Sequence, residues 1–209
     1  YPDKWGIDIL VTGSQKCLGC PPGLGMIMVG PKAWDIINKR EKIPSYYVNL
    51  PAYKKSFEKS LETPNTPAIS LMYGLHEALK MILEEGYEIR VKRHRLMAEA
   101  TRRGMEALGL QLLAEKGYES NTITALKYPE GIDDGAFRKG MQKHGTLVAG
   151  GQDHLRGKIF RVAHMNIIAE REILLVLAVT GLVLKELGLK CESGAGVSAA
   201  QEVFLKNLK

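Results

Sequence analysis

Residues 7–29 of the chain read IDILVTGSQKCLGCPPGLGMIMV, two short apolar runs joined by a loop rich in glycine and proline. The first run, Ile7–Thr12, predicts a buried strand that stops at Gly13, and the second, Gly25–Val29, predicts another strand. Lys16 therefore lies in a strand-to-strand connection. A lysine held in partly dry surroundings can lose its proton and act as a nucleophile. A lysine after a strand is more often a surface charge, so this loop alone leaves both roles open.

The rest of the chain predicts helices alternating with strands. Apolar residues at steps of three and four predict helices over Pro31–Lys39, from Pro67 to a break at Gly86, and over Tyr87–Leu108, Asp133–His144 and Ala169–Leu187. Strands are predicted at Thr122–Lys127, Leu147–Ala149 and Lys158–Ala163. The remaining stretches, Tyr46–Tyr53 and Glu192–Ala200, predict an irregular loop and a loose connector before a terminal helical turn. This order predicts an α/β layer with helices covering one face of a sheet.

Composition restricts the class of protein. The chain has 209 residues, of which 45% are hydrophobic and 25% charged, as in ordinary soluble domains. Its longest apolar run, Ile173–Leu184, is shorter than the roughly 20 residues that span a membrane, so no membrane segment is expected. Because the first residue is Tyr and no signal sequence follows, we expect that a leader has been removed or that the chain is a piece. Its three cysteines are too few for a disulfide framework, which makes a reducing cytoplasm the default setting.

The net charge of +6 does not indicate nucleic acid, because the basic residues are spread along the chain. The densest cluster, RVKRHR at 90–95, is predicted to form the solvated face of an amphipathic helix. Cys17 and Cys20 form a lone C-x-x-C without well-spaced histidines, so no metal site is expected. No phosphate-binding P-loop pattern is present. His164 is interpreted as a packed histidine at a strand end rather than a catalytic base.

Four segments, in order, resemble one enzyme family. Residues 3–25, DKWGIDILVTGSQKCLGCPPGLG, resemble the segment around the cofactor lysine of class V aminotransferases, which depend on pyridoxal phosphate (PLP) and include serine–pyruvate and alanine–glyoxylate aminotransferases. Residues 62–70 (ETPNTPAIS), 120–124 (SNTIT) and 157–165 (GKIFRVAHM) resemble later segments of the same family. The resemblance implies the α/β fold of type I PLP-dependent aminotransferases. Residues 1–88 would then be the C-terminal part of the large PLP-binding domain, and residues 89–209 the small C-terminal α/β domain.

The resemblance also implies roles for single residues. Lys16 would form the Schiff base with the cofactor and move the proton in transamination, while Gln15 would contact the cofactor. Arg161 would bind the α-carboxylate of the substrate, a task suited to a planar guanidinium. The position of Arg161 in an apolar strand supports two roles equally, ligand binding and a buried ion pair.

The segment before the predicted Pro67 helix would bind the cofactor phosphate. Thr63, Asn65 and Thr66 offer hydroxyl and amide groups near a helix start, where helix capping is the alternative role. In the family this loop reaches the cofactor of the other subunit, which implies a homodimer with shared active sites. Relatives carry other residues here, so which of the three makes the contact stays open.

The function implied is transamination between alanine or serine and glyoxylate or pyruvate. Family members carry a phosphate loop, a stacked aromatic ring and an aspartate for the pyridine nitrogen in a segment that would precede residue 1. The isolated chain is therefore expected to be inactive without an N-terminal half or a separate N-terminal fragment. Two alternatives remain, a cysteine desulfurase, for which Cys191 is poorly placed, and a catalytically incomplete split subunit.

Overall fold

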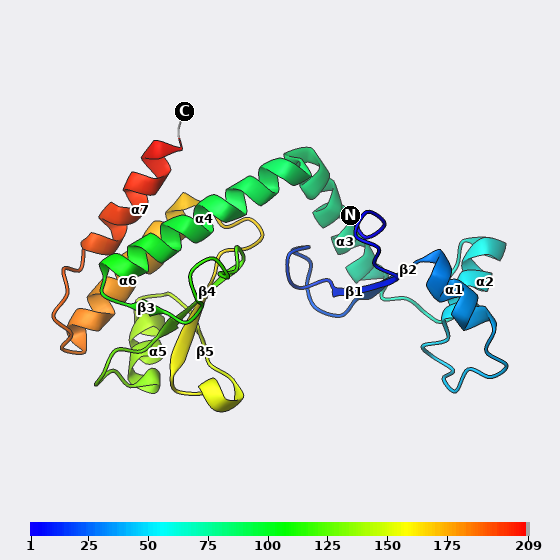
Figure 1. Cartoon of the computed structure of the whole chain (residues 1–209), viewed down its shortest axis with the longest axis horizontal. Helices are drawn as coiled ribbons and strands as arrows, with labels where there is room; N and C mark the ends of the chain where they lie inside the picture. Colours follow the sequence, from blue (N-terminus) through cyan, green and yellow to red (C-terminus); the bar gives the residue numbers. More distant parts are fainter. Residues whose placement is uncertain (208–209) are drawn as a thin grey trace. The chain divides into compact units, whose positions relative to one another are not determined.

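The computed structural model describes residues 1–207, which form two compact units, Tyr1–Glu84 and a second that begins at Glu85 (Figure 1). The first unit contains a two-stranded antiparallel sheet followed by helices. Its elements are β1 (Ile9–Gly13), β2 (Gly25–Val29), α1 (Pro31–Asn38), α2 (Leu50–Ser60) and most of α3 (Ile69–Glu85).

The predicted strand pair and the loop between its strands are confirmed, with Ile9 paired to Val29 and Gly13 to Gly25. The prediction that the first strand is buried is wrong. Ile9 and Val11 are 49% and 70% exposed, because β1 pairs only with β2 among the described residues. The buried residues of this unit are Ser14, Cys20, Gly30 and Ala33.

The irregular loop predicted over Tyr46–Tyr53 is partly wrong, because α2 already begins at Leu50. The Asn49 side chain caps this helix by accepting a hydrogen bond from the Ala52 backbone N–H at 3.1 Å. Pro51 occupies the first turn, where its missing N–H costs nothing. The loop prediction takes the aromatic stretch as one segment and does not use Asn49 and Pro51 as signals of a helix start.

The second unit is a four-stranded antiparallel sheet packed with helices. Its elements are α4 (Tyr87–Ala107), β3 (Gln111–Leu112), β4 (Ile123–Lys127), α5 (Asp134–Lys143), β5 (Ala149–Gly150), the 3-10 turn η1 (Asp153–Leu155), β6 (Ile159–Ala163), α6 (Glu170–Glu186) and α7 (Ala195–Lys206). The strand order is β3-β4-β6-β5. The helices and strands predicted between Tyr87 and Leu187 are all present, within two residues at each end.

The pairing of β4 with β6 shows which side chains lie on each face of this sheet. Thr124 pairs with Val162 and Leu126 with Phe160, and all four side chains are buried. Because neighbouring residues along a strand point to opposite faces, Arg161 lies on the other face. Phe160 and Val162 therefore pack on the face opposite Arg161.

The prediction of a loose connector over Glu192–Ala200 is wrong, because α7 starts at Ala195 and runs to Lys206. In Figure 1, α7 (red) lies beside α4 (green) and α6 (orange), and the three helices contact one another. Small residues make this close packing possible, since Gly196 lies against Leu108, directly after α4. Within residues 1–207, no helix combines the length and apolarity needed to cross a bilayer.

Candidate active site

The Lys16 loop is held by Ser14, which is completely buried. The Ser14 hydroxyl donates a hydrogen bond to the Pro21 carbonyl at 2.6 Å and accepts one from the Leu24 N–H at 3.3 Å. The Ser14 carbonyl accepts a further bond from the Cys20 N–H at 3.0 Å. Ser14 therefore joins both sides of the loop.

The same loop is packed onto α3. The Cys20 thiol contacts the Leu71 carbonyl at 3.6 Å, and Gly23 lies so close to Leu71 that an added Cβ would be 2.5 Å from Leu71 Cδ1. Gly23 also has a φ of +135°, a conformation that side chains rarely adopt. The glycine of the Pro-Pro-Gly segment is thus required by both backbone conformation and packing.

Lys16 and Gln15 project from this fastened loop and are exposed. Among the described residues, the Lys16 amine has no hydrogen-bond or ion-pair partner. The expectation of a partly dry lysine is not met within this chain, because the strand before it is itself exposed. The Lys16 amine is instead open to solvent.

The segment Thr63–Thr66 precedes α3, the helix that supports the Lys16 loop. The Thr63 hydroxyl donates to the Asn65 carbonyl at 2.7 Å, and the Asn65 amide donates to the Tyr53 hydroxyl at 3.5 Å. Thr66 is exposed and its side chain has no hydrogen-bond partner within residues 1–207. Thr66 is thus the one of the three residues whose side chain makes no hydrogen bond within residues 1–207.

Arg161 belongs to the second unit and is half-buried on β6. Its Nε donates to the Gly150 carbonyl at 2.9 Å. Neither terminal nitrogen of the guanidinium has a partner in the described part of the chain, and no carboxylate there lies within ion-pair distance. A buried ion pair, one of the two roles left open, is therefore not formed within this part of the chain.

His164 is a packed histidine, as predicted, with no exposed surface. Its Nε2 lies 2.8 Å from the Thr124 hydroxyl and its Nδ1 lies 3.2 Å from the Asn121 carbonyl. Burial lowers its pKa to about 4, so the imidazole is neutral near pH 7. Both ring nitrogens are occupied by structural contacts, which leaves none for catalysis.

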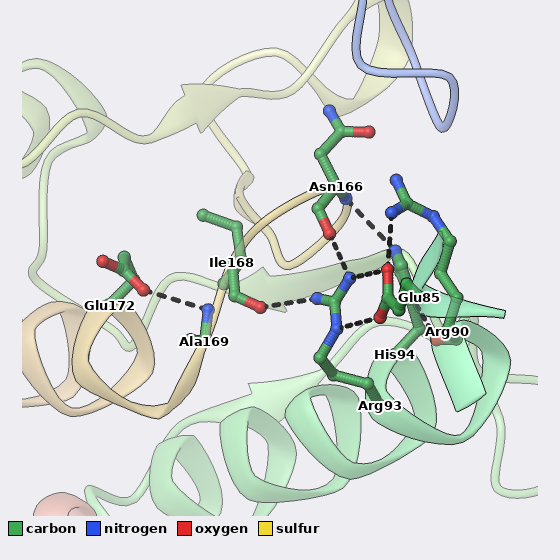
Figure 2. Close-up of polar contacts among 8 residues, drawn as sticks. All are labelled: Glu85, Arg90, Arg93, His94, Asn166, Ile168, Ala169 and Glu172. Atoms are coloured by element: carbon green, nitrogen blue, oxygen red, sulfur yellow. Dashed lines mark hydrogen bonds and ion pairs between the residues drawn. The ribbon is translucent and has the colours of Figure 1, made fainter. Parts of the chain in front are cut away.

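The solvated helix face predicted at 90–95 is only partly confirmed, because three members of this basic cluster are not solvated. Figure 2 shows Arg93 reaching the segment after β6, where it donates to the Asn166 carbonyl at 2.7 Å and to the Ile168 carbonyl at 2.8 Å. Its guanidinium also forms a two-point ion pair with Glu85. The Arg93 side chain thereby lowers the pKa of Glu85.

Arg90 and His94 complete this cluster. Arg90 donates to Glu85 at 2.8 Å, while His94 accepts the Asn166 N–H at Nε2, 3.1 Å away. Its Nδ1 lies 2.7 Å from the Arg90 carbonyl, so an Nδ1 proton would be donated to that carbonyl. Asn166 has a left-handed φ of 67°. The cluster therefore holds a strained turn that follows the Arg161 strand, and the sequence pattern offers no signal of it beyond the charges.

The cysteines do not form a metal site. Cys17 is exposed and Cys20 is buried against α3, and neither forms a disulfide. Across the residues that the structure describes, no three side chains of the types His, Cys, Asp and Glu gather closely enough to hold an ion.

Known aminotransferases resemble this chain over nearly its whole length. An uncharacterized aminotransferase of Methanocaldococcus jannaschii is 52% identical over 205 residues, which are 98% of this chain and 53% of that protein. The serine–glyoxylate aminotransferase of Arabidopsis thaliana is 37% identical over 95% of this chain and 50% of its own length. The chain spans about half the length of the curated relatives it matches.

Solved structures show the same fold. The crystal structure of pyridoxamine–pyruvate aminotransferase from Mesorhizobium loti matches 99% of this chain and 54% of that one, with a TM-score of 0.93 and 32% identity. The sequence model described as aminotransferase class-V matches residues 1–167. The chain therefore has the type I aminotransferase fold and belongs to the class V aminotransferase family.

Proposed function

We propose that this chain is part of a PLP-dependent aminotransferase that exchanges the amino group between alanine or serine and glyoxylate or pyruvate. One observation carries the proposal. Lys16 presents an unpaired amine on a loop fastened by Ser14 and by α3, at the position where the sequence resembles the cofactor lysine. The Arabidopsis relative is named for the serine–glyoxylate reaction, which supports the substrate class.

The residues present fit PLP. The cofactor supplies an aldehyde for amines and a pyridine ring that accepts an electron pair. Lys16 Nζ would hold the cofactor aldehyde and, once released by the amino group of the substrate, would carry the proton between substrate Cα and cofactor C4′. Gln15, next along the exposed loop, is the candidate for a polar contact to the cofactor.

The Thr63–Thr66 segment is the proposed phosphate contact. Thr63 and Asn65 already make hydrogen bonds, whereas Thr66 has a free hydroxyl among the described residues, so Thr66 is favoured among the three. By resemblance to the family, this segment would serve the cofactor of a second subunit, and the working enzyme would be a homodimer.

Arg161 is the proposed site for the substrate carboxylate. A guanidinium with two free terminal nitrogens can form two parallel charge-assisted hydrogen bonds with a carboxylate. An unpaired arginine in the interior of a sheet lowers stability unless an anion pairs with its charge. Substrate binding would supply that anion.

We propose that activity requires an N-terminal portion in addition to residues 1–209, whether on the same polypeptide or separate. The relatives are about twice as long, and the first unit exposes apolar side chains on both strands, such as Val11 at 70% and Ile27 at 44%. Such surface is normally covered in a folded enzyme. A cytoplasmic location accords with three cysteines that form no disulfide with one another.

Two alternatives are weaker. A cysteine desulfurase would need a mobile cysteine near the cofactor, but Cys191 is half-buried with its thiol 3.9 Å from the Gly181 carbonyl. A split subunit without catalytic activity would not need to keep an unpaired Lys16 amine and an unpaired Arg161 fork.

The test uses the complete enzyme with bound cofactor. Lys16→Ala should remove the visible absorbance of the covalently held cofactor and abolish transamination of serine with glyoxylate. Arg161→Ala should keep that absorbance and raise the KM for serine by about a hundredfold, because a bidentate charged contact contributes roughly 3 kcal/mol. Equal loss of cofactor in both variants would contradict the assigned roles.

A further inference from the structure

The guanidinium of Arg161 is anchored at one of its three nitrogens. Its Nε donates to the Gly150 carbonyl at 2.9 Å, and β5 holds that carbonyl in place by pairing with β6. Ala149 pairs with Arg161 and Gly150 with Phe160, while the Gly151 N–H donates to the Ile159 carbonyl at 3.0 Å. The strand that carries the arginine and the carbonyl that orients it are therefore parts of one hydrogen-bonded ladder.

Gly150 lies against an ion pair on α5. A Cβ added at Gly150 would be 3.3 Å from Asp134 Oδ1 and 3.4 Å from Arg138 Nε. These two side chains hold each other through two contacts, Nε to Oδ1 at 3.1 Å and Nη2 to Oδ2 at 2.7 Å. A side chain at position 150 larger than a methyl group would therefore collide with this pair.

The ion pair is itself attached to the core. The Tyr128 hydroxyl donates to Asp134 Oδ1 at 2.9 Å, and the Tyr128 ring packs against Phe137 and Phe160 with centroids 5.5 and 5.3 Å apart. Arg138 lowers the pKa of Asp134, and burial raises the pKa of Tyr128, so the carboxylate stays charged and the phenol stays protonated near pH 7. The ion pair behind Gly150 is therefore linked through Tyr128 to the aromatic core.

The chain after Gly150 is equally confined. A Cβ at Gly151 would be 2.0 Å from the Leu155 carbonyl, a contact that no side chain can make without moving backbone. Residues 150–151 consequently pass between α5 and the η1 turn through a gap that admits no side chain at position 151 and only a small one at position 150. A carbonyl in such a gap has little freedom to shift.

We propose that Gly150 is a positioning residue for substrate binding: its carbonyl holds Arg161 Nε so that the carboxylate is bound end-on by the two terminal nitrogens. Asp134, Arg138 and Tyr128 keep that carbonyl in place. This inference rests on the proposed role of Arg161. It goes further in assigning which guanidinium nitrogens bind the substrate and why position 150 disfavours a bulky side chain.

The experiment compares variants of the complete enzyme with bound cofactor, using serine and glyoxylate as probes. Gly150→Val adds a side chain that strands accept readily but that has no room beside Arg138. We expect the KM for both probes to rise about tenfold, equivalent to roughly 1.4 kcal/mol, with kcat and cofactor absorbance nearly unchanged. Gly150→Ala should give a smaller rise in KM.

A second substitution tests the mechanism. Arg138→Ala vacates the space that a valine side chain at position 150 needs. Gly150→Val should therefore raise the KM much less in an enzyme that already carries Arg138→Ala than in the native enzyme. Recovery would show that the collision with Arg138 causes the rise in KM. Gly135→Ala is the matched control, since its Cβ would lie 3.2 Å from Asp133 Oδ1 on the same helix without touching β5, and it should leave KM unchanged.

A measurement independent of activity keeps the test decisive if Gly150→Val does not fold. Nitrogen-15 NMR of arginine side chains should show slow hydrogen exchange at Arg161 Nε–H and faster exchange in Gly150→Ala. An unchanged KM and unchanged exchange in the Gly150 variants, with a raised KM in Arg161→Ala, would overturn the inference and leave the carboxylate role standing. An unchanged KM in Arg161→Ala would overturn both.

Discussion

His164 illustrates how one buried residue links stability to pH. Its imidazole has no exposed surface, and burial lowers its pKa from 6.5 to about 4. The unfolded chain therefore takes up a proton more readily than the folded one between these values. The contribution of neutral His164 to the free energy of unfolding is therefore fully present above pH 6.5 and is lost as pH falls toward 4.

We predict that lowering pH from about 7.5 to about 4.5 costs the native chain about 2 kcal/mol more than it costs His164→Gln, because glutamine cannot be protonated. Urea unfolding at both pH values measures the difference. Thr124→Val is a useful companion, since it removes the hydroxyl 2.8 Å from Nε2 but leaves the histidine to titrate. An identical pH dependence in native chain and His164→Gln would mean that this histidine is not held neutral.

Arg93 is the residue whose importance is least visible in the pattern of charges. It bonds two backbone carbonyls after β6 and a carboxylate before α4. We predict that Arg93→Ala lowers the free energy of unfolding by about 2 kcal/mol, because half-buried acceptors lose their charged donor. Thermal and urea unfolding measure this change.

Arg95 provides the control for that substitution. It lies two residues further along α4, it is exposed, and it has no partner among the described residues. Arg95→Ala should change stability by less than about 0.5 kcal/mol. Similar losses in both variants would attribute the effect to helix propensity or net charge instead of the contacts in Figure 2.

At the level of secondary-structure elements, α4, α6 and α7 pack through glycines. A Cβ at Gly104 would be 2.5 Å from Leu177 Cδ1 and 2.8 Å from the Gly196 carbonyl. Alanine is the better helix former by about 1 kcal/mol, yet overpacking costs roughly 1 to 3 kcal/mol. We predict that Gly104→Ala is destabilising by about 1 kcal/mol, measured by urea unfolding.

Gly194 is the matched position without crowding. It precedes α7 with a φ of −85°, and nothing lies within 4 Å of an added Cβ. Gly194→Ala should be neutral or slightly stabilising, because it restricts only the unfolded chain. Stabilisation by Gly104→Ala would show that the three helices are less tightly packed than the distances indicate.

Two helices show where sequence pattern suffices and where it does not. The stretch before Phe204 is rich in Gly, Ser and Ala, which predicts a connector, yet it forms the first turns of α7. Helix α7 forms because small residues let it approach α4 closely, and that contact outweighs weak intrinsic propensity. By contrast, α5 is predicted at nearly its true bounds because Asp133 caps it through a hydrogen bond at 2.8 Å.

At the scale of the whole molecule, the first unit buries far fewer apolar side chains than the second. The core cluster of buried apolar residues lies entirely beyond residue 96. We predict that residues 1–209 alone bind PLP weakly and do not transaminate, whereas addition of the N-terminal portion restores both. A PLP titration followed by visible absorbance, with serine-dependent turnover, measures this.

Dye binding offers a second measurement of the same prediction. A dye that fluoresces on apolar surface should bind the isolated chain and should be displaced when the N-terminal portion is added, because the exposed β1 and β2 side chains become covered. A tight covalent PLP complex with full turnover in the isolated chain would contradict the proposed requirement.

The order of most elements, the family and the candidacy of Lys16 and Arg161 could all be predicted from the sequence, because these depend on local periodicity and on motifs that stay together along the chain. Only the tertiary structure shows which side chains already have hydrogen-bond partners. Thr63 and Asn65 are bonded while Thr66 has no partner within residues 1–207, Arg93 lies in a polar cluster, and the Gly150 carbonyl accepts a hydrogen bond from Arg161. Most of these contacts join residues that spacing does not relate, so their geometry exists only once strands pair and helices pack.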